Sequence, residues 1–463
     1  MKHDGIQTRN LGLSSLFGLT ALALLNACSG PTLGATSEQT IEGTLETVVV
    51  GNATLERSHF EYFLETREGA WIKLSFEGRP ELLHGDGDHQ HLVLPGHLHD
   101  SATARIELRA TGLIDANGLT VSDIEFTGRD ADLDHGAEPL IAASPRKVAV
   151  ILANFANNSS QPITVAAARD LVFGGAQSAN AYFKEVSFGI RSLVGKVAAT
   201  GDVYGWYTIA ASNTPCDYSA WGSAARAAAQ AAGVDLSGYD HVIHYFPNSS
   251  ACQWSGVGQV PGRYTWINAS GAQTIAHELG HNFGSHHAAS LRCKDANGAA
   301  VPISANCTTS EYGNPFDVMG RGYRHLTAFN KGRVGFLEPE NTVTVSADGT
   351  FDIAPLEKKS TGIQSLRVRI DTSTAYYVEF RQAYGFDNFS TTSSVVKGVL
   401  ITRAPIAYTT LAMPGLIDMT PSTSTYTDAA LLPGQTFTDP ARQLSIRLNS
   451  VSATAATVSV DFP

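Results

Sequence analysis

The chain has 463 residues, of which 43% are hydrophobic and 16% charged, so it is long enough for about three domains with packed cores. Its formal net charge is −11, and its basic residues are not clustered. This balance argues against nucleic acid and against an anionic membrane surface as partners.

The first 27 residues have the pattern of an export signal. Basic residues precede an apolar run over residues 11–25, which is too short to span a bilayer comfortably. The run ends in the sequence LNAC, which resembles the cleavage box of a bacterial lipoprotein and would make Cys28 the lipidated residue. Two outcomes stay open: anchoring at the cell envelope through Cys28, with residues 28–40 as a tether, or free secretion after cleavage nearby, for example after Ala35.

The next region alternates apolar and polar side chains with a period of two. Runs at 44–50, 71–76 and 104–109 are separated by turn residues. This pattern predicts a small antiparallel β-domain, such as a barrel, over residues 41–128. Residues 129–146 carry Asp, Gly, Pro and Ala without periodicity, which predicts a linker.

A histidine-rich segment lies inside this β-domain. Potential metal ligands follow one another closely: His84, Asp86, Asp88, His89, His91, His97 and His99. A solvated loop is the favoured interpretation, because polar, glycine-rich runs are typical of loops. A second metal site for zinc or calcium is the alternative, and calcium has no other support in the sequence.

Residues 147–340 alternate strands and helices. Continuous apolar runs predict buried strands at 147–155 and 239–246. Two more strands are expected within 193–209, and helical spacing or composition predicts helices at 164–173, 180–186, 219–232, 270–283 and 327–334. Together they predict a mixed sheet flanked by helices.

The helix predicted at 270–283 carries the sequence H-E-x-x-H-x-x-G-x-x-H. On a helix His277 and His281 lie on one face, four residues apart, so both imidazoles can reach one metal. Glu278 projects about 100° away and is placed to reach a water at the metal. Gly284 can enter φ > 0 and end the helix, which lets the chain turn back and bring His287 to the same point.

Three neutral imidazoles with one open position are typical of a catalytic zinc site, whereas a structural site fills all four positions. His286 could compete as the third ligand, but the spacing favours His287. His286 is then expected to lie beside the site or to face solvent.

Cysteine usage agrees with export. If Cys28 is lipidated, an even set of four cysteines remains, which in an exported protein suggests two disulfides. Three connectivities are open, and sequence proximity favours Cys216–Cys252 and Cys293–Cys307. From residue 341 to 463 period-two alternation returns, as at 342–345 and 366–370, which predicts a C-terminal β-sandwich.

The histidine motif places the chain among the metzincins, and within them it resembles the gametolysin-like peptidases. The phrase EYGNPFDVMG over residues 311–320 looks like the Met-turn of that family. The stretches 179–187 and 376–387 look similar too, so the resemblance covers residues 147–463. It implies a multidomain α+β protein in which a metzincin-like catalytic domain is flanked by the two β-regions.

The resemblance also implies roles for single residues. It implies a zinc endopeptidase with His277, His281 and His287 as ligands, Glu278 as general base and acid, and Met319 as the structural floor of the site. Asp317 is expected to be a turn residue. Tyr323 could stabilise the oxyanion or could simply pack below the site.

The main functional hypothesis is therefore an exported zinc metalloendopeptidase that hydrolyses extracellular proteins or glycoproteins. One alternative is a surface adhesion or carbohydrate-binding protein with an inert core, and another is a zinc hydrolase with a downstream Glu as third ligand. The intact Glu278 and the Gly284–His287 spacing argue against these two. A monomer is assumed.

The N-terminal β-domain is a candidate propeptide. It has no cysteine after Cys28, so a cysteine-switch mechanism has no thiol to use. Acidic or histidine side chains just upstream of residue 147 could reach the zinc instead: Asp130, Asp132, Asp134 and His135.

Overall fold

The computed structural model describes residues 38–52, 57–77, 79–84, 91–92, 106–129, 144–408 and 413–463. The chain divides into two units, residues 1–37 and 38–463, and all described helices and strands belong to the second. They form a β-rich α+β protein with several sheets and few helices, so the predicted α+β class is confirmed. Within the described ranges, no helix is both long enough and apolar enough to cross a membrane.

The largest sheet has 11 strands and includes both N-terminal strands and strands from the histidine-motif region. Its order is β10 (Asp202–Ile209), β8 (Ser144–Phe155), β11 (His241–Phe246), β13 (Tyr264–Asn268), β12 (Gly256–Gln259), β1 (Gln39–Asn52), β2 (Arg57–Glu65), β3 (Trp71–Ser75), β7 (Gly118–Arg129) and β6 (Ile106–Asp115), with β9 (Arg191–Val194) beside β8. From β10 to β13 neighbours are parallel, and β12 is antiparallel to both β13 and β1. The apolar runs at 147–155 and 239–246 form β8 and β11, as predicted.

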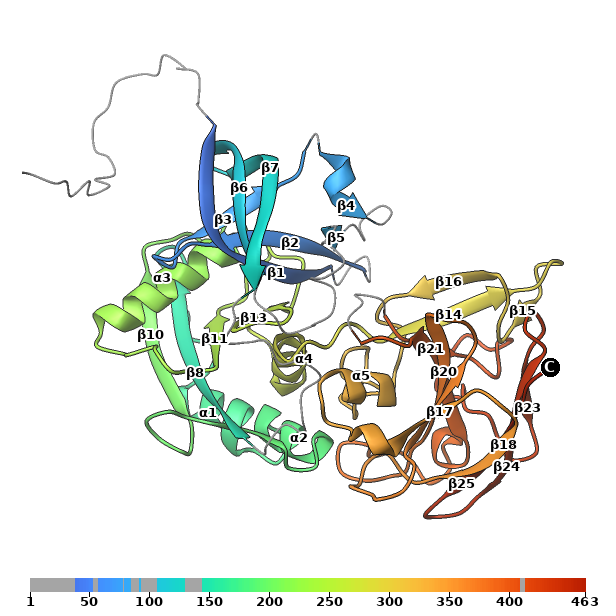
Figure 1. The fold of residues 1–463 in the computed structure, drawn as a ribbon. Helices are drawn as coiled ribbons and strands as arrows, with labels where there is room; N and C mark the ends of the chain where they lie inside the picture. Colours follow the sequence, from blue (N-terminus) through green and yellow to red (C-terminus); the bar gives the residue numbers. More distant parts are fainter. Residues whose placement is uncertain are drawn as a thin grey trace, which may run out of the picture. The chain divides into compact units, whose positions relative to one another are not determined.

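Helices cover both faces of the parallel part of this sheet (Figure 1). Successive side chains of β8 point to opposite faces, so they contribute alternately to two separate cores. One core is shared with α3 (Tyr218–Ala231), and the other with α1 (Val165–Arg169), α2 (Ala179–Val186) and α4 (Ala272–Asn282). The remaining described helical segments are α5 (Ala328–Arg333), a π-helical turn η4 (Asp170–Gly174), and the 3-10 turns η1 (Pro80–Leu82), η5 (Pro339–Asn341) and η6 (Ser394–Val396).

Strands of the N-terminal region close into a ring, which we call the N-terminal barrel. β1 pairs with both β2 and β6, so the order β1-β2-β3-β7-β6 returns to β1. Buried leucines, among them Leu64 and Leu108, fill its interior. β1 is long enough to pair outside the ring as well: residues 39–45 pair with β6, and residues 48–50 pair with β2 on one side and with β12 on the other. Two short strands, β4 (Leu83–His84) and β5 (His91–Leu92), pair with each other.

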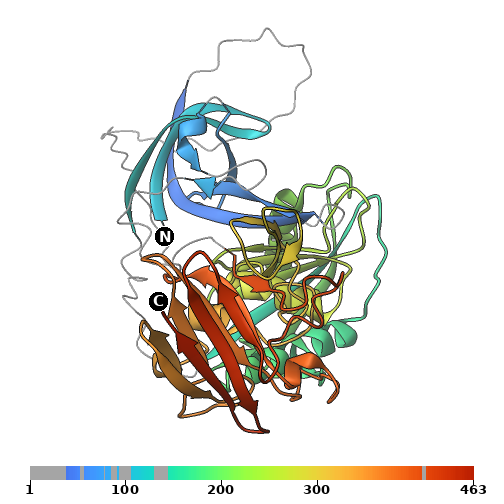
Figure 2. The same cartoon turned by 90° about the vertical axis from the view of Figure 1, so that its right-hand side faces the viewer.

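Two further sheets form the C-terminal region. The first has the order β15 (Ala300–Val301), β14 (Ala289–Lys294), β22 (Gly415–Ile417), β21 (Val399–Pro405), β20 (Thr374–Phe380), β19 (Ser365–Arg369) and β17 (Thr342–Val345), with β16 (Asn306–Ser310) beside β14. The second has the order β18 (Gly349–Ile353), β25 (Ala456–Asp461), β24 (Leu444–Val451) and β23 (Thr436–Asp439). Both contribute to one apolar core, so they pack as two layers (Figure 2).

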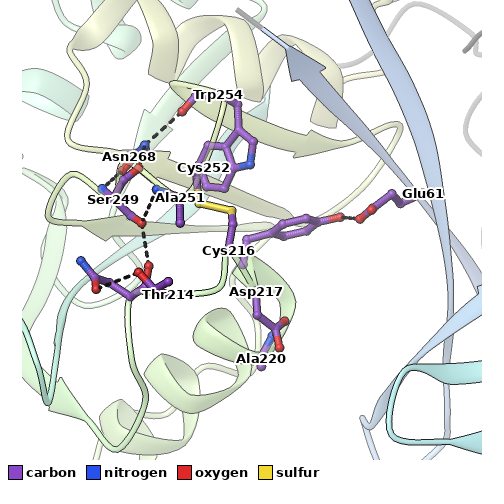
Figure 3. The surroundings of a disulfide bond; sticks show 12 residues. Glu61, Thr214, Cys216, Asp217, Ala220, Ser249, Ala251, Cys252, Trp254 and Asn268 are labelled. Atoms are coloured by element: carbon purple, nitrogen blue, oxygen red, sulfur yellow. Dashed lines mark hydrogen bonds between the residues drawn. A yellow bond between two sulfur atoms is a disulfide. The ribbon is translucent and has the colours of Figure 1, made fainter.

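The first of these sheets begins before residue 341, where the sequence analysis starts the C-terminal domain. β14 follows α4 closely in the chain but pairs in parallel with β22, so the segment after the histidine motif belongs to this sheet. The structure contains both predicted disulfides, Cys216–Cys252 and Cys293–Cys307. The first lies at the start of α3, where the hydroxyl of Tyr218 donates a hydrogen bond to Glu61 of β2 (Figure 3).

Candidate metal centre

α4 carries most of the histidine motif and is followed by the predicted turn. Gly284, just beyond the helix, has a φ of 96°. The Ser285 amide donates to the Gly280 carbonyl at 2.9 Å, and the Gly284 amide donates to the His281 carbonyl at 2.8 Å. These two bonds make a Schellman cap, in which a left-handed glycine reverses the chain. The reversal brings His287 back to α4, as the spacing predicts.

The structure brings His277, His281 and His287 together, and one ring nitrogen from each lies within 4.8 Å of the others. Two of the rings have an Nδ1 atom next to a backbone carbonyl oxygen. This distance is 2.8 Å from His277 to Val318 and 2.9 Å from His281 to Ser285. A carbonyl can only accept, so these Nδ1 atoms carry the hydrogen and each neutral ring has its lone pair on Nε2.

The Nε2 atoms converge. Nε2 of His281 lies 3.1 Å from Nε2 of His287. Two nitrogen lone pairs at this distance repel each other unless a proton or a cation lies between them. Burial, together with the neighbouring His287, lowers the pKa of His277 to about 3 and the pKa of His281 well below its usual value. Protons are therefore disfavoured, and the three nitrogens fit a metal cation.

The third ring is oriented by a buried carboxylate that sequence reasoning missed. Nδ1 of His287 lies 2.5 Å from Oε1 of Glu311, and both side chains are buried. Both the amide and the hydroxyl of Ser58, at the start of β2, also donate to this carboxylate. Burial alone would raise the pKa of Glu311, but the bonds from His287 and Ser58 outweigh it and lower the pKa. A carboxylate behind a ligand histidine fixes its tautomer and increases its basicity.

Glu278 points toward Gly256 and Gly258 of β12, which carry no side chain. A Cβ on Gly256 would lie 2.5 Å from Oε1 of Glu278, and a Cβ on Gly258 would lie 2.8 Å from its carbonyl oxygen. Both glycines lie on the same face of the strand, two residues apart. They leave the room that this carboxyl group occupies. Burial raises the pKa of Glu278 well above its usual value, and the residue is 5% exposed.

The Met-turn packs directly under the helix. Met319 is fully buried, and a Cβ on Gly280 would lie 2.5 Å from its sulfur atom. Asp317 accepts hydrogen bonds from the amides of Met319 at 2.7 Å and Thr327 at 2.6 Å. Burial raises the pKa of Asp317 to about 6 despite these bonds. Asp317 therefore holds the turn, in agreement with its predicted role.

Two tyrosines near the Met-turn can now be placed, one of them at a position that the sequence did not predict. Tyr323 stacks on Tyr182 at 5.3 Å between ring centroids and donates to the Gln177 carbonyl, which favours the packing interpretation. Tyr312 is the tyrosine beside the metal centre, with its ring centroid 4.0 Å from that of His287. His286 is buried near Phe60 of β2 and does not belong to the histidine cluster.

Several predicted residues lie outside the described part of the chain. They include the lipidation candidate and the upstream residues that could reach a metal: Cys28, Asp130, Asp132, Asp134 and His135. Most of the histidine-rich segment 84–99 lies outside it as well, although the backbones of His84 and His91 pair across β4 and β5.

Comparison with known families gives a match over the middle of the chain. A sequence model described as gametolysin peptidase M11 matches residues 147–373. Residues 147–373 therefore form a gametolysin-like peptidase segment. The matched segment begins where the sequence analysis places the peptidase region, and it contains the three histidines, Glu278 and the Met-turn.

The match extends past the predicted boundary at residue 340 into the C-terminal sheet, as the pairing of β14 with β22 would lead one to expect. The gametolysin-like segment also contains Glu311 and Tyr312, whereas Ser58 and the N-terminal barrel lie outside it. No curated protein sequence matches the chain.

Proposed function

We propose that the chain is a zinc-dependent metalloendopeptidase of the metzincin type that acts on extracellular proteins or glycoproteins. The observation that carries this proposal is the convergence of three imidazole rings whose Nδ1 atoms already face hydrogen-bond acceptors. Imidazole nitrogen is a preferred ligand of Zn²⁺, and a three-histidine set leaves a fourth position open for water or substrate.

A bound zinc ion would polarise the scissile carbonyl and lower the pKa of a water toward neutrality. The protein's own part is to hold the three rings in one tautomer. The Val318 and Ser285 carbonyls do this for His277 and His281, and Glu311 does it for His287. Met319 supports the helix from below.

Glu278 is the proposed general base and acid. It follows His277 directly on α4, and its carboxyl group lies in the space left by Gly256 and Gly258. It accepts a proton from the attacking water and delivers that proton to the leaving amine nitrogen. Burial favours its neutral form in the protein without metal, and a nearby cation would favour the carboxylate that a base requires.

We also propose that the protein works outside the cytoplasm. Each of the four cysteines after Cys28 is in a disulfide, and disulfides of this kind persist in oxidising compartments. The leader sequence supports export, and Cys28 is the proposed anchor for a lipid. Mass measurement of the mature N-terminus would test this, since an unmodified N-terminus beyond Cys28 would contradict anchoring.

The test of the peptidase compares matched carboxyl-to-amide variants. Glu278→Gln keeps the size of the side chain but removes the base, so we expect normal zinc content with turnover of casein reduced about 10³-fold. Glu125→Gln, which is exposed on β7, should behave as wild type. Activity of Glu278→Gln close to that of Glu125→Gln would contradict the role of Glu278. It would then favour hydrolysis by another group or a contaminant.

A further inference from the structure

The longest strand of the N-terminal barrel, β1, lies along β12, which is the edge strand of the peptidase region's part of the large sheet. Residues Val48, Val49 and Val50 of β1 pair with Gln259, Gly258 and Val257 of β12 in antiparallel register. The amide of Val260 donates to the Thr47 carbonyl at 3.0 Å. Glu46 and Gln259, both buried, are joined by a side-chain hydrogen bond of 2.5 Å. The outer edge of β12 is therefore filled by the chain's own residues.

That edge is next to the proposed base. β12 packs against α4 through Gly256 and Gly258, which face Glu278. β1 is the next strand over, about 4.8 Å further out, because that is the spacing of paired strands. An extended polypeptide brought to Glu278 along this edge would need the same main-chain groups that β1 uses, and an edge strand can accept only one partner.

The barrel also contacts the other side of the metal centre. Ser58 donates to the carboxylate of Glu311, which orients His287. At Gly51 of β1, an added Cβ would lie 2.7 Å from the hydroxyl oxygen of Tyr312, whose ring lies against His287. Three groups around the site are nearly inaccessible: the exposed fraction is 5% for Glu278, 3% for His287 and 4% for Glu311, whereas His277 is half-buried.

A second contact between the barrel and the peptidase region is apolar and lies away from the histidines. Trp71 of β3 packs against Tyr264 and Trp266 at ring-centroid distances of 5.6 and 5.9 Å. Phe63 of β2 belongs to the same core as α3 and the peptidase sheet. Beside it, Glu61 accepts the hydrogen bond from Tyr218 next to the Cys216–Cys252 disulfide (Figure 3).

We propose that the N-terminal barrel is a removable cover, and that residues 48–51 of β1 occupy the place of an extended substrate polypeptide along β12. This inference rests on the proposed peptidase function. It differs from inhibition by a propeptide side chain that binds the metal. Here substrate is excluded by strand pairing and by contacts of the barrel to Glu311 and Tyr312. No side chain of β1 needs to reach the metal.

The experiment uses the whole mature chain with a recognition site for a specific protease engineered between β7 and β8. The protein is cut there after folding, and size-exclusion chromatography then reports whether the barrel fragment remains bound. Trp71→Ala weakens the apolar contact without touching the metal centre, and Leu113→Ala, at an exposed position on β6, is its matched control. Hydrolysis of a short extended peptide is measured before the cut, after the cut and after release.

The second readout does not depend on catalysis. Hydrogen exchange of those amides that residues 256–260 direct toward β1, that of Val260 among them, is followed in the Glu278→Gln background. The amides of β11 show whether the sheet stays folded. We expect these amides facing β1 to be protected in the intact chain and to exchange fast after release, while β11 stays protected. Hydrolysis should rise roughly tenfold or more on release, and Trp71→Ala should release the cut barrel more readily than Leu113→Ala.

Three results separate this proposal from the proposed function. Hydrolysis that is measurable and equal in the intact and the released protein would overturn the cover, and so would unchanged exchange of β12 after release. If β12 becomes exposed on release but the zinc-loaded protein still hydrolyses nothing, the covering role of β1 stands and the peptidase proposal fails.

Discussion

The N-terminal barrel and the C-terminal sheets both contact the peptidase region, but they do so in different ways. The barrel contacts the surroundings of the histidine cluster, through the pairing of β1 with β12 and through the hydrogen bonds from Ser58 to Glu311. The C-terminal sheet contacts the segment that carries the Met-turn, through Arg381, whose guanidinium donates to the Phe316 and His325 carbonyls. The contacts of the barrel cover the site, whereas the contacts of the C-terminal sheet stabilise the segment on which the site is built.

The support is a buried charge cluster. Arg381 is fully buried and pairs with Asp387 at 2.5 Å, Glu379 at 2.9 Å and Glu357 at 3.0 Å. Glu379 also accepts from the amide of Ala328, at the start of α5. The members of this cluster join the C-terminal sheet to the segment that carries the Met-turn, so the cluster should be needed for folding. The barrel should be needed only to keep substrate away from the site.

The largest effect is expected from breaking the support. Arg381→Met leaves three buried acidic side chains without their cation, so the free energy of unfolding should fall by about 3–5 kcal/mol. Urea unfolding monitored by tryptophan fluorescence measures this. Arg109→Met, which removes an exposed arginine paired with Glu42 and Glu125, is the control and should leave the unfolding midpoint unchanged. Equal midpoints for the two variants would show that the cluster does not support the fold.

Acid should weaken the same support. Burial, together with the nearby Lys331, lowers the pKa of His325 to about 4 from its ordinary value of 6.5. The unfolded chain therefore binds this proton first, and the stability contribution of His325 is complete above pH 6.5 and is lost as the pH falls from 6.5 toward 4. The loss is about 3 kcal/mol at most. In His325→Gln the unfolding free energy should vary less with pH across this window, and an unchanged slope would contradict the assignment.

A smaller effect is expected on the covered side. Glu311→Gln keeps an oxygen near His287 but removes the negative charge behind the ring, so zinc affinity should fall by about 10–100-fold. Competition with a chromogenic chelator measures this affinity without reference to turnover. Glu340→Gln, at an exposed position, is the control. Unchanged zinc affinity in Glu311→Gln would mean that Glu311 does not tune His287, and that its role is limited to the hydrogen bonds with Ser58 of the barrel.

The sequence predicted the parts of the site that depend on local spacing. The intervals from His277 to His287 fix which side chains share a helical face and where Gly284 must turn, so the cluster could be anticipated without a structure. Strands β8 and β11 could be anticipated because a strand buried on both faces is apolar throughout.

The contacts missed are those between distant segments. Ser58 and Glu311 are 253 residues apart, and no spacing rule links them. The pairing of β1 with β12 has no signature either, since any alternating strand can offer its main chain to any free edge. A general signal did exist for Glu311: a ligand histidine needs an acceptor for its Nδ1 hydrogen. That rule predicts that a partner exists but not where it lies in the chain.

The most direct test of the peptidase itself is hydrolysis of denatured casein by the chain after barrel release, with zinc content determined on the same sample. We predict about one zinc per chain and hydrolysis that is lost on chelation and restored when zinc is returned. Released protein that holds zinc at His277, His281 and His287 but leaves casein intact would contradict the account. The chain would then have to be a binding protein with an inert core.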